Sequence, residues 1–167
     1  MNQLKHISSD DVRRIKFSHN GSRFLVISRY DVISYLLDGT VDGIPVEPGG
    51  FFDAAYVGPD TIVASTALRG KLDEWVEALA LYDLHNGHII ESIATNDVRS
   101  LCVDFSRNRI LAGSLTGDLG GYVETYDFNL KRLTRFESKE MPFDMVISHS
   151  GNHIAVASVF FELGHQR

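Results

Sequence analysis

Cysteine, long apolar runs and clusters of basic residues are scarce in this sequence, and each shortage argues against a class of protein. The single cysteine, Cys102, cannot form an internal disulfide, so nothing points to an oxidising compartment. The N-terminal residues lack the apolar stretch of a signal peptide, and no apolar run approaches the ~20 residues that span a bilayer. We therefore expect a cytoplasmic protein without a membrane partner.

The charge balance is acidic. The chain has 16 Lys and Arg against 22 Asp and Glu, a formal net charge of −6, and no run of basic residues. Such a surface repels the phosphates of nucleic acid and attracts basic proteins. The sequence thus predicts no nucleic-acid partner, and it favours a basic protein over an acidic one.

Motifs for catalysis and cofactor binding are also missing. The glycines and serine of residues 113–117 stand in the wrong order for a nucleophile elbow, and no Lys-Ser/Thr pair completes a P-loop. The histidine pairs of residues 85–88 and 149–153 span turns and have no third ligand. Cys102 falls in an apolar segment and is predicted to be an inert core thiol. These absences predict a non-enzymatic protein without metal or cofactor.

What the sequence does contain is an internal repeat. Residues 18–28 (SHNGSRFLVIS) match residues 148–158 (SHSGNHIAVAS), and looser copies occupy residues 57–65 and 106–114. Each copy is a polar turn followed by a tight apolar run that ends in serine, and an apolar segment precedes it. This pattern is typical of a β-hairpin. The closing serines lie 37, 49 and 44 residues apart, close to the period of a four-stranded unit.

Further strands complete each repeat. Residues 78–93 and 121–136 both read as strand, turn and strand, and the Tyr-Asp pair at 82–83 recurs 44 residues later. Only residues 72–80 have the pattern of a short helical turn. We therefore predict one all-β domain over residues 1–167, built from four-stranded antiparallel meanders. In the first repeat Ile15 and Phe17 alternate with Lys16, so we expect the two apolar residues to be buried.

These segments resemble the repeats of WD-repeat and YVTN-type β-propellers. The resemblance rests on V-x-x-I-x-F-S at residues 12–18, on the S-H-x-G turn and on Tyr-Asp in the third strand. It implies a small propeller-like array of about four blades. The chain lacks the Trp-Asp and Gly-His pairs of that family, and familiar members carry more blades.

Two arrangements of the array remain open at this point. Residues 4–7 could add the missing outer strand to the last blade, which would close the ring and remove an exposed sheet edge. Alternatively the array is an open half-ring that pairs with a second copy as a homodimer, or it is a fragment of a larger propeller.

One end of the array collects acidic residues. In a meander, the segment before each first strand and the loop after each second strand lie on the same side. Each repeat places one acid before its first strand, at Asp11, Asp53, Asp97 and Asp144. The loops predicted on this side are residues 66–78, with the only tryptophan, and residues 115–121. Long loops on a rigid scaffold are common sites of function.

This acidic loop face is the predicted binding site. Its residues are Asp53, Asp73, Glu74, Trp75, Glu77, Asp97, Asp118 and Asp144. The leading hypothesis is a protein-binding module, in its most concrete form an inhibitor or immunity-type protein that masks a basic toxin or nuclease. The alternatives are an enzyme, metal-dependent or hydrolytic, that uses the acidic ring, and a structural half of a larger propeller. The structural interpretation of the same residues is that the aspartates cap turns and that Trp75 packs on a blade.

Overall fold

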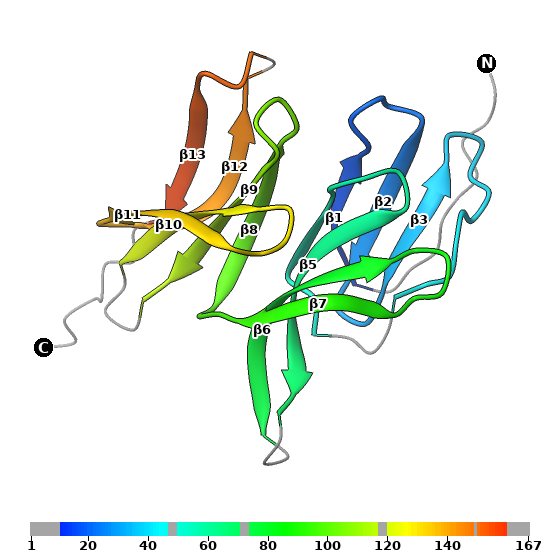
Figure 1. Ribbon diagram of the computed structural model, residues 1–167, viewed down its shortest axis with the longest axis horizontal. Coiled ribbons are helices and arrows are strands. Elements are labelled where there is room, and N and C mark those ends of the chain that lie inside the picture. The colour runs from blue at the N-terminus through cyan, green and yellow to red at the C-terminus, as the bar shows by residue number, and fades with distance from the viewer. Residues whose placement is uncertain (1–10, 47–49, 71–73, 117–119, 149, 160–167) are drawn as a thin grey trace, which may run out of the picture.

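The computed structural model describes residues 11–46, 50–70, 74–116, 120–148 and 150–159. Within these ranges all regular structure is β, with thirteen strands and no helix. The strands form four antiparallel sheets, each made of strands that follow one another in the chain (Figure 1). The prediction of an all-β protein built from repeated antiparallel meanders is confirmed.

The sheets follow the repeats. The first sheet contains β1 (Val12–Phe17), β2 (Arg23–Ser28) and β3 (Val32–Leu36). The second contains β4 (Asp53–Tyr56), β5 (Thr61–Arg69), β6 (Trp75–Asp83) and β7 (Ile89–Ala94). The third contains β8 (Val98–Asp104), β9 (Arg109–Leu115), β10 (Gly121–Asp127) and β11 (Arg132–Ser138). The fourth contains β12 (Met141–Ile147) and β13 (Ile154–Val159). Four strands per repeat are thus present in the two middle sheets.

The closing serine of each repeat has the same place in its sheet. It pairs with a residue near the start of the first strand, in the pairs Val12↔Ser28, Asp53↔Ser65, Val98↔Ser114 and Pro142↔Ser158. The S-H-x-G turns match as well, because Gly21 and Gly151 both adopt a φ of 69°, a left-handed conformation that glycine reaches without strain. The sequence repeat is therefore a structural repeat in register.

Consecutive sheets pack face to face around two apolar cores. Leu25 and Ile27 of the first sheet meet Ile62 of the second sheet in one core. Val63, the next residue of β5, belongs to the other core, together with Leu101 of the third sheet. Because side chains alternate across a strand, a sheet covered on both faces needs apolar residues at consecutive positions. This explains why the second strands are almost continuously apolar.

The sheets form an open arc. Figure 1 shows them in chain order, with the first sheet at one end and the fourth sheet at the other. The opening strands β1, β4, β8 and β12 lie along the inside of the arc, each in contact with the next. No strand pairing among the described residues closes the arc into a ring, and the predicted closing segment, residues 4–7, lies outside these residues.

Three predictions about local structure are wrong. Ile15 and Phe17 are 57% and 65% exposed, whereas Lys16 turns inward to an acidic partner described below. Alternation shows that the faces of β1 differ, but it does not say which face meets the core. Residues 66–69 and 75–78 belong to strands and not to the predicted loop, because β5 continues to Arg69 and β6 begins at Trp75. For the same reason the helical turn predicted within residues 72–80 is absent from Trp75 onward.

Candidate functional site

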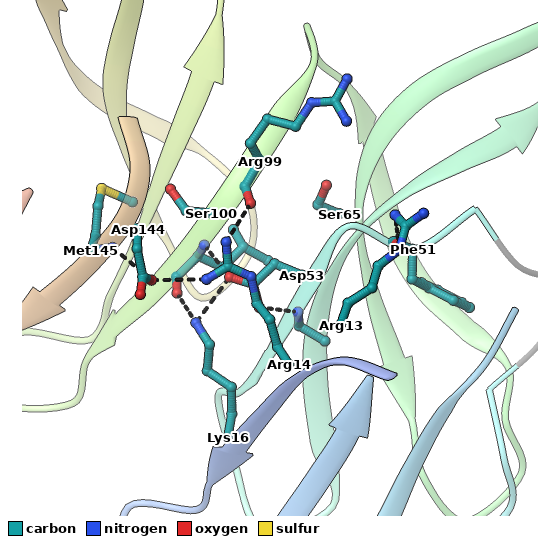
Figure 2. Close-up of polar contacts among 12 residues, drawn as sticks. Arg13, Arg14, Lys16, Phe51, Asp53, Ser65, Arg99, Ser100, Asp144 and Met145 are labelled. Carbon is teal, nitrogen blue, oxygen red and sulfur yellow. Dashed lines mark hydrogen bonds and ion pairs between the residues drawn. The ribbon is translucent and has the colours of Figure 1, made fainter. Parts of the chain in front are cut away.

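A groove of about 930 Å³ runs along the inside of the arc, between the four opening strands. Cationic side chains dominate its polar lining, which includes Arg13, Arg14, Lys16 and Arg99 beside a single carboxylate, that of Asp144. Figure 2 shows Arg14 and Lys16 directed to Asp53, which lies behind the groove wall, whereas Arg13 reaches the backbone oxygen of Phe51 and the guanidinium of Arg99 points away from Asp53. The centre of the molecule is therefore a network of ion pairs and not an acidic ring.

Asp53 is the hub of this network. Its side chain is fully buried, and its Oδ2 accepts hydrogen bonds from Lys16 Nζ (2.9 Å) and from the backbone N–H of Leu101 (2.7 Å). Its Oδ1 accepts a bond from the backbone N–H of Ala54 (2.9 Å) and lies 3.8 Å from Arg14 Nε. Burial raises the pKa of Asp53, and the two cations oppose that shift. One carboxylate thus ties β1, β4 and β8 together.

Arg14 extends the network to the fourth sheet. Its Nη1 donates to Asp144 Oδ1 (2.9 Å), and its Nη2 donates to the backbone oxygen of Phe143 (2.8 Å). Lys16 Nζ also donates to the backbone oxygen of Leu101 (2.6 Å). Two side chains of β1 therefore span the groove and link the first sheet to the third and fourth.

Backbone bulges direct further side chains into the groove. The pairing register shifts at equivalent places in three opening strands, at Arg13 in β1, Arg99 in β8 and Phe143 in β12. A bulge kinks a strand locally and re-aims the extra side chain, and all three of these residues line the groove. The ring of Phe52 is near the guanidinium groups of Arg99 and Arg13, whose Cζ atoms are 4.1 Å and 5.5 Å from the ring centre.

The prediction that Asp53 is exposed on the acidic loop face is wrong, because its side chain is buried and cannot contact a partner. Asp97 forms an ion pair with Arg99, and Asp144 forms one with Arg14. Three of the four acids before the first strands, Asp53, Asp97 and Asp144, are thus paired with cations of the same chain. The sequence contained a sign of this pairing. Residues 12–17 (VRRIKF), which form β1, include three cations, and β1 faces the acids of the other repeats.

The remaining described residues of the predicted site, Glu74, Trp75 and Glu77, lie on a two-stranded ribbon. β5 and β6 pair over nine residues, from Thr61↔Asp83 to Arg69↔Trp75. Their neighbours stop earlier, because the β4 pairing ends at Ser65 and the β7 pairing begins at Ala78. The ends of β5 and β6 therefore extend beyond the sheets, as Figure 1 shows. Asp73 and Asp118 lie outside the described residues.

The base of the ribbon lies near Arg99, one of the side chains that line the groove. Glu77 is half-buried, and burial, together with the nearby carboxylate of Asp97, raises the pKa of Glu77 while Arg99 opposes the shift. Trp75 lies two residues further out on the same face of β6, and its side chain is 64% exposed. The ribbon therefore presents an aromatic side chain beside carboxylates that are only partly compensated.

Other candidate residues belong to the structure of the sheets. Phe51 is buried edge-on against Tyr82 in the core. Cys102 is half-buried, and burial raises the pKa of its thiol, which disfavours the nucleophilic thiolate. A second hollow of about 430 Å³ lies among the turns at the far end of the strands, lined in part by Tyr56, Phe105 and Phe128.

The described residues contain no cluster of three or more His, Cys, Asp or Glu side chains that could hold a metal ion. They also contain no helix long and apolar enough to cross a membrane.

No protein-family model matches the chain, and no curated protein matches it at a significant level. The resemblance to β-propeller repeats accordingly stays a prediction, based on the sequence repeat alone.

Proposed function

We propose that this chain is a non-enzymatic protein-binding module whose β5–β6 ribbon recognises a basic protein. The observation that carries the proposal is the exposure of Trp75 at the end of the ribbon, where 64% of the side chain meets solvent. Tryptophan is the residue type most enriched among the side chains that dominate binding energy. An exposed tryptophan at the tip of a projecting element suits insertion into a partner.

The ribbon is held in shape before any partner arrives. The pairing of β5 with β6 is uninterrupted over nine residues, and Leu68, near the end of β5, packs against the core of the first and second sheets. At the tip, the N–H of Gly70 donates to the backbone oxygen of Glu74 (2.8 Å). Binding then costs little conformational entropy, since the contact residues are already ordered.

Charge supports a basic partner. Glu74 is exposed beside Trp75, and the raised pKa of Glu77 reflects burial and the neighbouring carboxylate of Asp97. A cation from a partner would relieve that repulsion, and the net charge of −6 on the chain would speed encounter with a basic protein. The concrete form of the proposal is a cytoplasmic inhibitor or immunity-type protein that masks a basic toxin or nuclease.

A second candidate function is a structural half of a larger ring. Four sheets that pack face to face with a repeated register support a propeller-like arc. The uncovered apolar faces of the first and fourth sheets favour continuation of that arc.

The test is capture with matched baits. Wild-type protein, Trp75→Ala and Phe136→Ala would be immobilised and exposed to lysate of the source organism, and the retained proteins identified by mass spectrometry. Phe136 is a suitable control because it lies on β11, outside the ribbon, and is 60% exposed. We expect a basic protein retained by wild type and Phe136→Ala and lost from Trp75→Ala. Equal retention by all three baits would remove the ribbon from the proposal.

A further inference from the structure

The two terminal sheets each leave one apolar face uncovered. On the first sheet this face includes Ile15 and Phe17, which are 57% and 65% exposed; on the fourth it includes Phe143 and Val146, which are 51% and 60% exposed. By contrast, Ile62 and Val63 of the second sheet are fully buried on its two faces. Contiguous exposed apolar side chains of this size mark interaction surfaces.

The uncovered faces open on the same side of the arc. Ile15 and Phe17 from β1 and Phe143 and Val146 from β12 all line the groove of about 930 Å³. Figure 1 places the first and fourth sheets at opposite ends of the arc, with the two four-stranded sheets between them. A partner that covers both faces must therefore contact both ends of the arc at once.

The chain itself shows what covers such a face. We call the face of a sheet that is turned toward the next sheet in the chain its forward face, and the opposite face its rear face. In the first contact, Leu25 and Ile27 on the forward face of the first sheet pack against Ile62 on the rear face of the second. In the second contact, Val63 on the forward face of the second sheet packs against Leu101 of the third. The fourth sheet has a free forward face, and the first sheet has a free rear face. These are the two complementary halves of one more contact of the same kind.

We infer that two copies of this chain pair about a two-fold axis, with the first sheet of each copy packed on the fourth sheet of the other. Two arcs of four sheets would then form a closed ring of eight, and the two grooves would become one enclosed channel. A two-fold axis makes each contact occur twice. A stable interface buries roughly 1,200–2,000 Å² in total, so each of the two contacts needs to supply only about half of that area.

The junction is apolar and not ionic. Arg14 and Lys16 pair across the sheet with Ile27 and Leu25, whose side chains face the second sheet. They bind Asp144 and Asp53, respectively, within the same chain. The uncovered face of the first sheet therefore offers Ile15 and Phe17 to the apolar side chains of the fourth sheet.

The primary test is the mass of the protein in solution, measured by light scattering over a range of concentrations. Wild type should have twice the chain mass. Phe17→Lys and Val146→Glu should each shift the protein to monomer, because each buries an unpaired charge in both contacts. An equimolar mixture of the two variants should recover the dimer, since one contact then pairs Lys with Glu and the other is wild type. Phe136→Lys, on β11, should remain dimeric.

Three results would overturn the inference. The first is a wild type that is monomeric at ~100 µM, a concentration well above the dissociation constant of a stable dimer. The others are a dimer that neither variant weakens and a mixture of the variants that stays monomeric. Circular dichroism would verify that the variants fold. If either variant does not fold, hydrogen exchange of the wild-type protein at low and high concentration provides the test. The amides of β1 and β12 must then gain protection as the dimer forms. Unchanged protection there would contradict the pairing. The test does not involve Trp75, so its outcome is separate from that of the ribbon proposal.

Discussion

The central groove and the tip of the β5–β6 ribbon both collect carboxylates and aromatic side chains, yet they differ in what surrounds them. Behind the groove wall, Asp53 is fully buried and accepts a hydrogen bond from Lys16. On the ribbon, Glu74 and Trp75 are exposed. The difference arises because a cationic strand, β1, faces the groove, whereas the ribbon extends beyond its neighbours. Of the acids predicted on one face, Asp53 is thus part of an internal ion-pair network, whereas Glu74 is exposed to solvent.

The largest effect on stability is expected from Asp53→Ala. The change leaves Lys16 Nζ and the N–H of Leu101 without their carboxylate acceptor in the interior. Removing one partner of a buried ion pair costs about 3–5 kcal/mol, and the lower end applies here because the Lys16 side chain is 22% exposed. Urea unfolding would measure the loss. Asp53→Asn keeps a hydrogen-bond acceptor and should cost less. A loss below ~1 kcal/mol for Asp53→Ala would show that the network is not structural.

A smaller effect is expected from Arg14→Met, which preserves the apolar stem and removes the guanidinium. The variant loses the bonds to Asp144 and to the backbone oxygen of Phe143. Hydrogen bonds to charged groups contribute about 1.5–3 kcal/mol, and the half-exposed Asp144 can be rehydrated, so we expect a cost of about 1.5 kcal/mol. Hydrogen exchange should show the loss mainly as faster exchange in β12. Uniform destabilisation of all four sheets would contradict the role of Arg14 as a link to the fourth sheet.

The smallest effect is expected from Glu77→Gln, and it has a definite pH dependence. The pKa of Glu77 is raised in the folded protein. Between the unfolded and folded pKa values the folded protein binds more protons, so stability falls as pH rises through that window, and the full penalty is present above the folded pKa. Glu77→Gln removes this penalty. The variant should gain about 0.5 kcal/mol or less at neutral pH and nothing below the unfolded pKa. A gain that grows in acid would have the wrong sign.

Much of the fold could be predicted because the repeat is local. The serines that end each apolar run and the S-H-x-G turns occupy equivalent places in the sheets. Period and register follow from hydrophobic pattern and turn chemistry, which the sequence displays directly. The first and fourth sheets have three and two strands among the described residues. The sequence predicted a missing outer strand for the last repeat, and the segment expected to supply it, residues 4–7, lies outside the described residues.

The candidate site was predicted less well, because its character depends on contacts between repeats. Whether an aspartate is exposed depends on what the next sheet brings to it, and Lys16 is 37 residues from Asp53 in the chain. The segment from Trp75 to Ala80 suits a helix or a strand by composition, and only its pairing with β5 decides. Ile15 and Phe17 are likewise exposed because no sheet of the described chain covers their face of β1. The alternation of apolar and polar residues in the strand does not show which face is covered.

The most direct test of the ribbon as the binding site is a comparison of two variants against the captured partner. Trp75→Ala and Phe136→Ala each remove an exposed aromatic side chain, one on the ribbon and one on β11. Affinity would be measured by surface plasmon resonance, and unfolding by urea. We expect Trp75→Ala to lose at least ~2 kcal/mol of binding free energy, mainly through faster dissociation, with stability changed by less than ~0.5 kcal/mol. Phe136→Ala should bind like wild type. Equal affinity of the two variants for the partner would contradict the account.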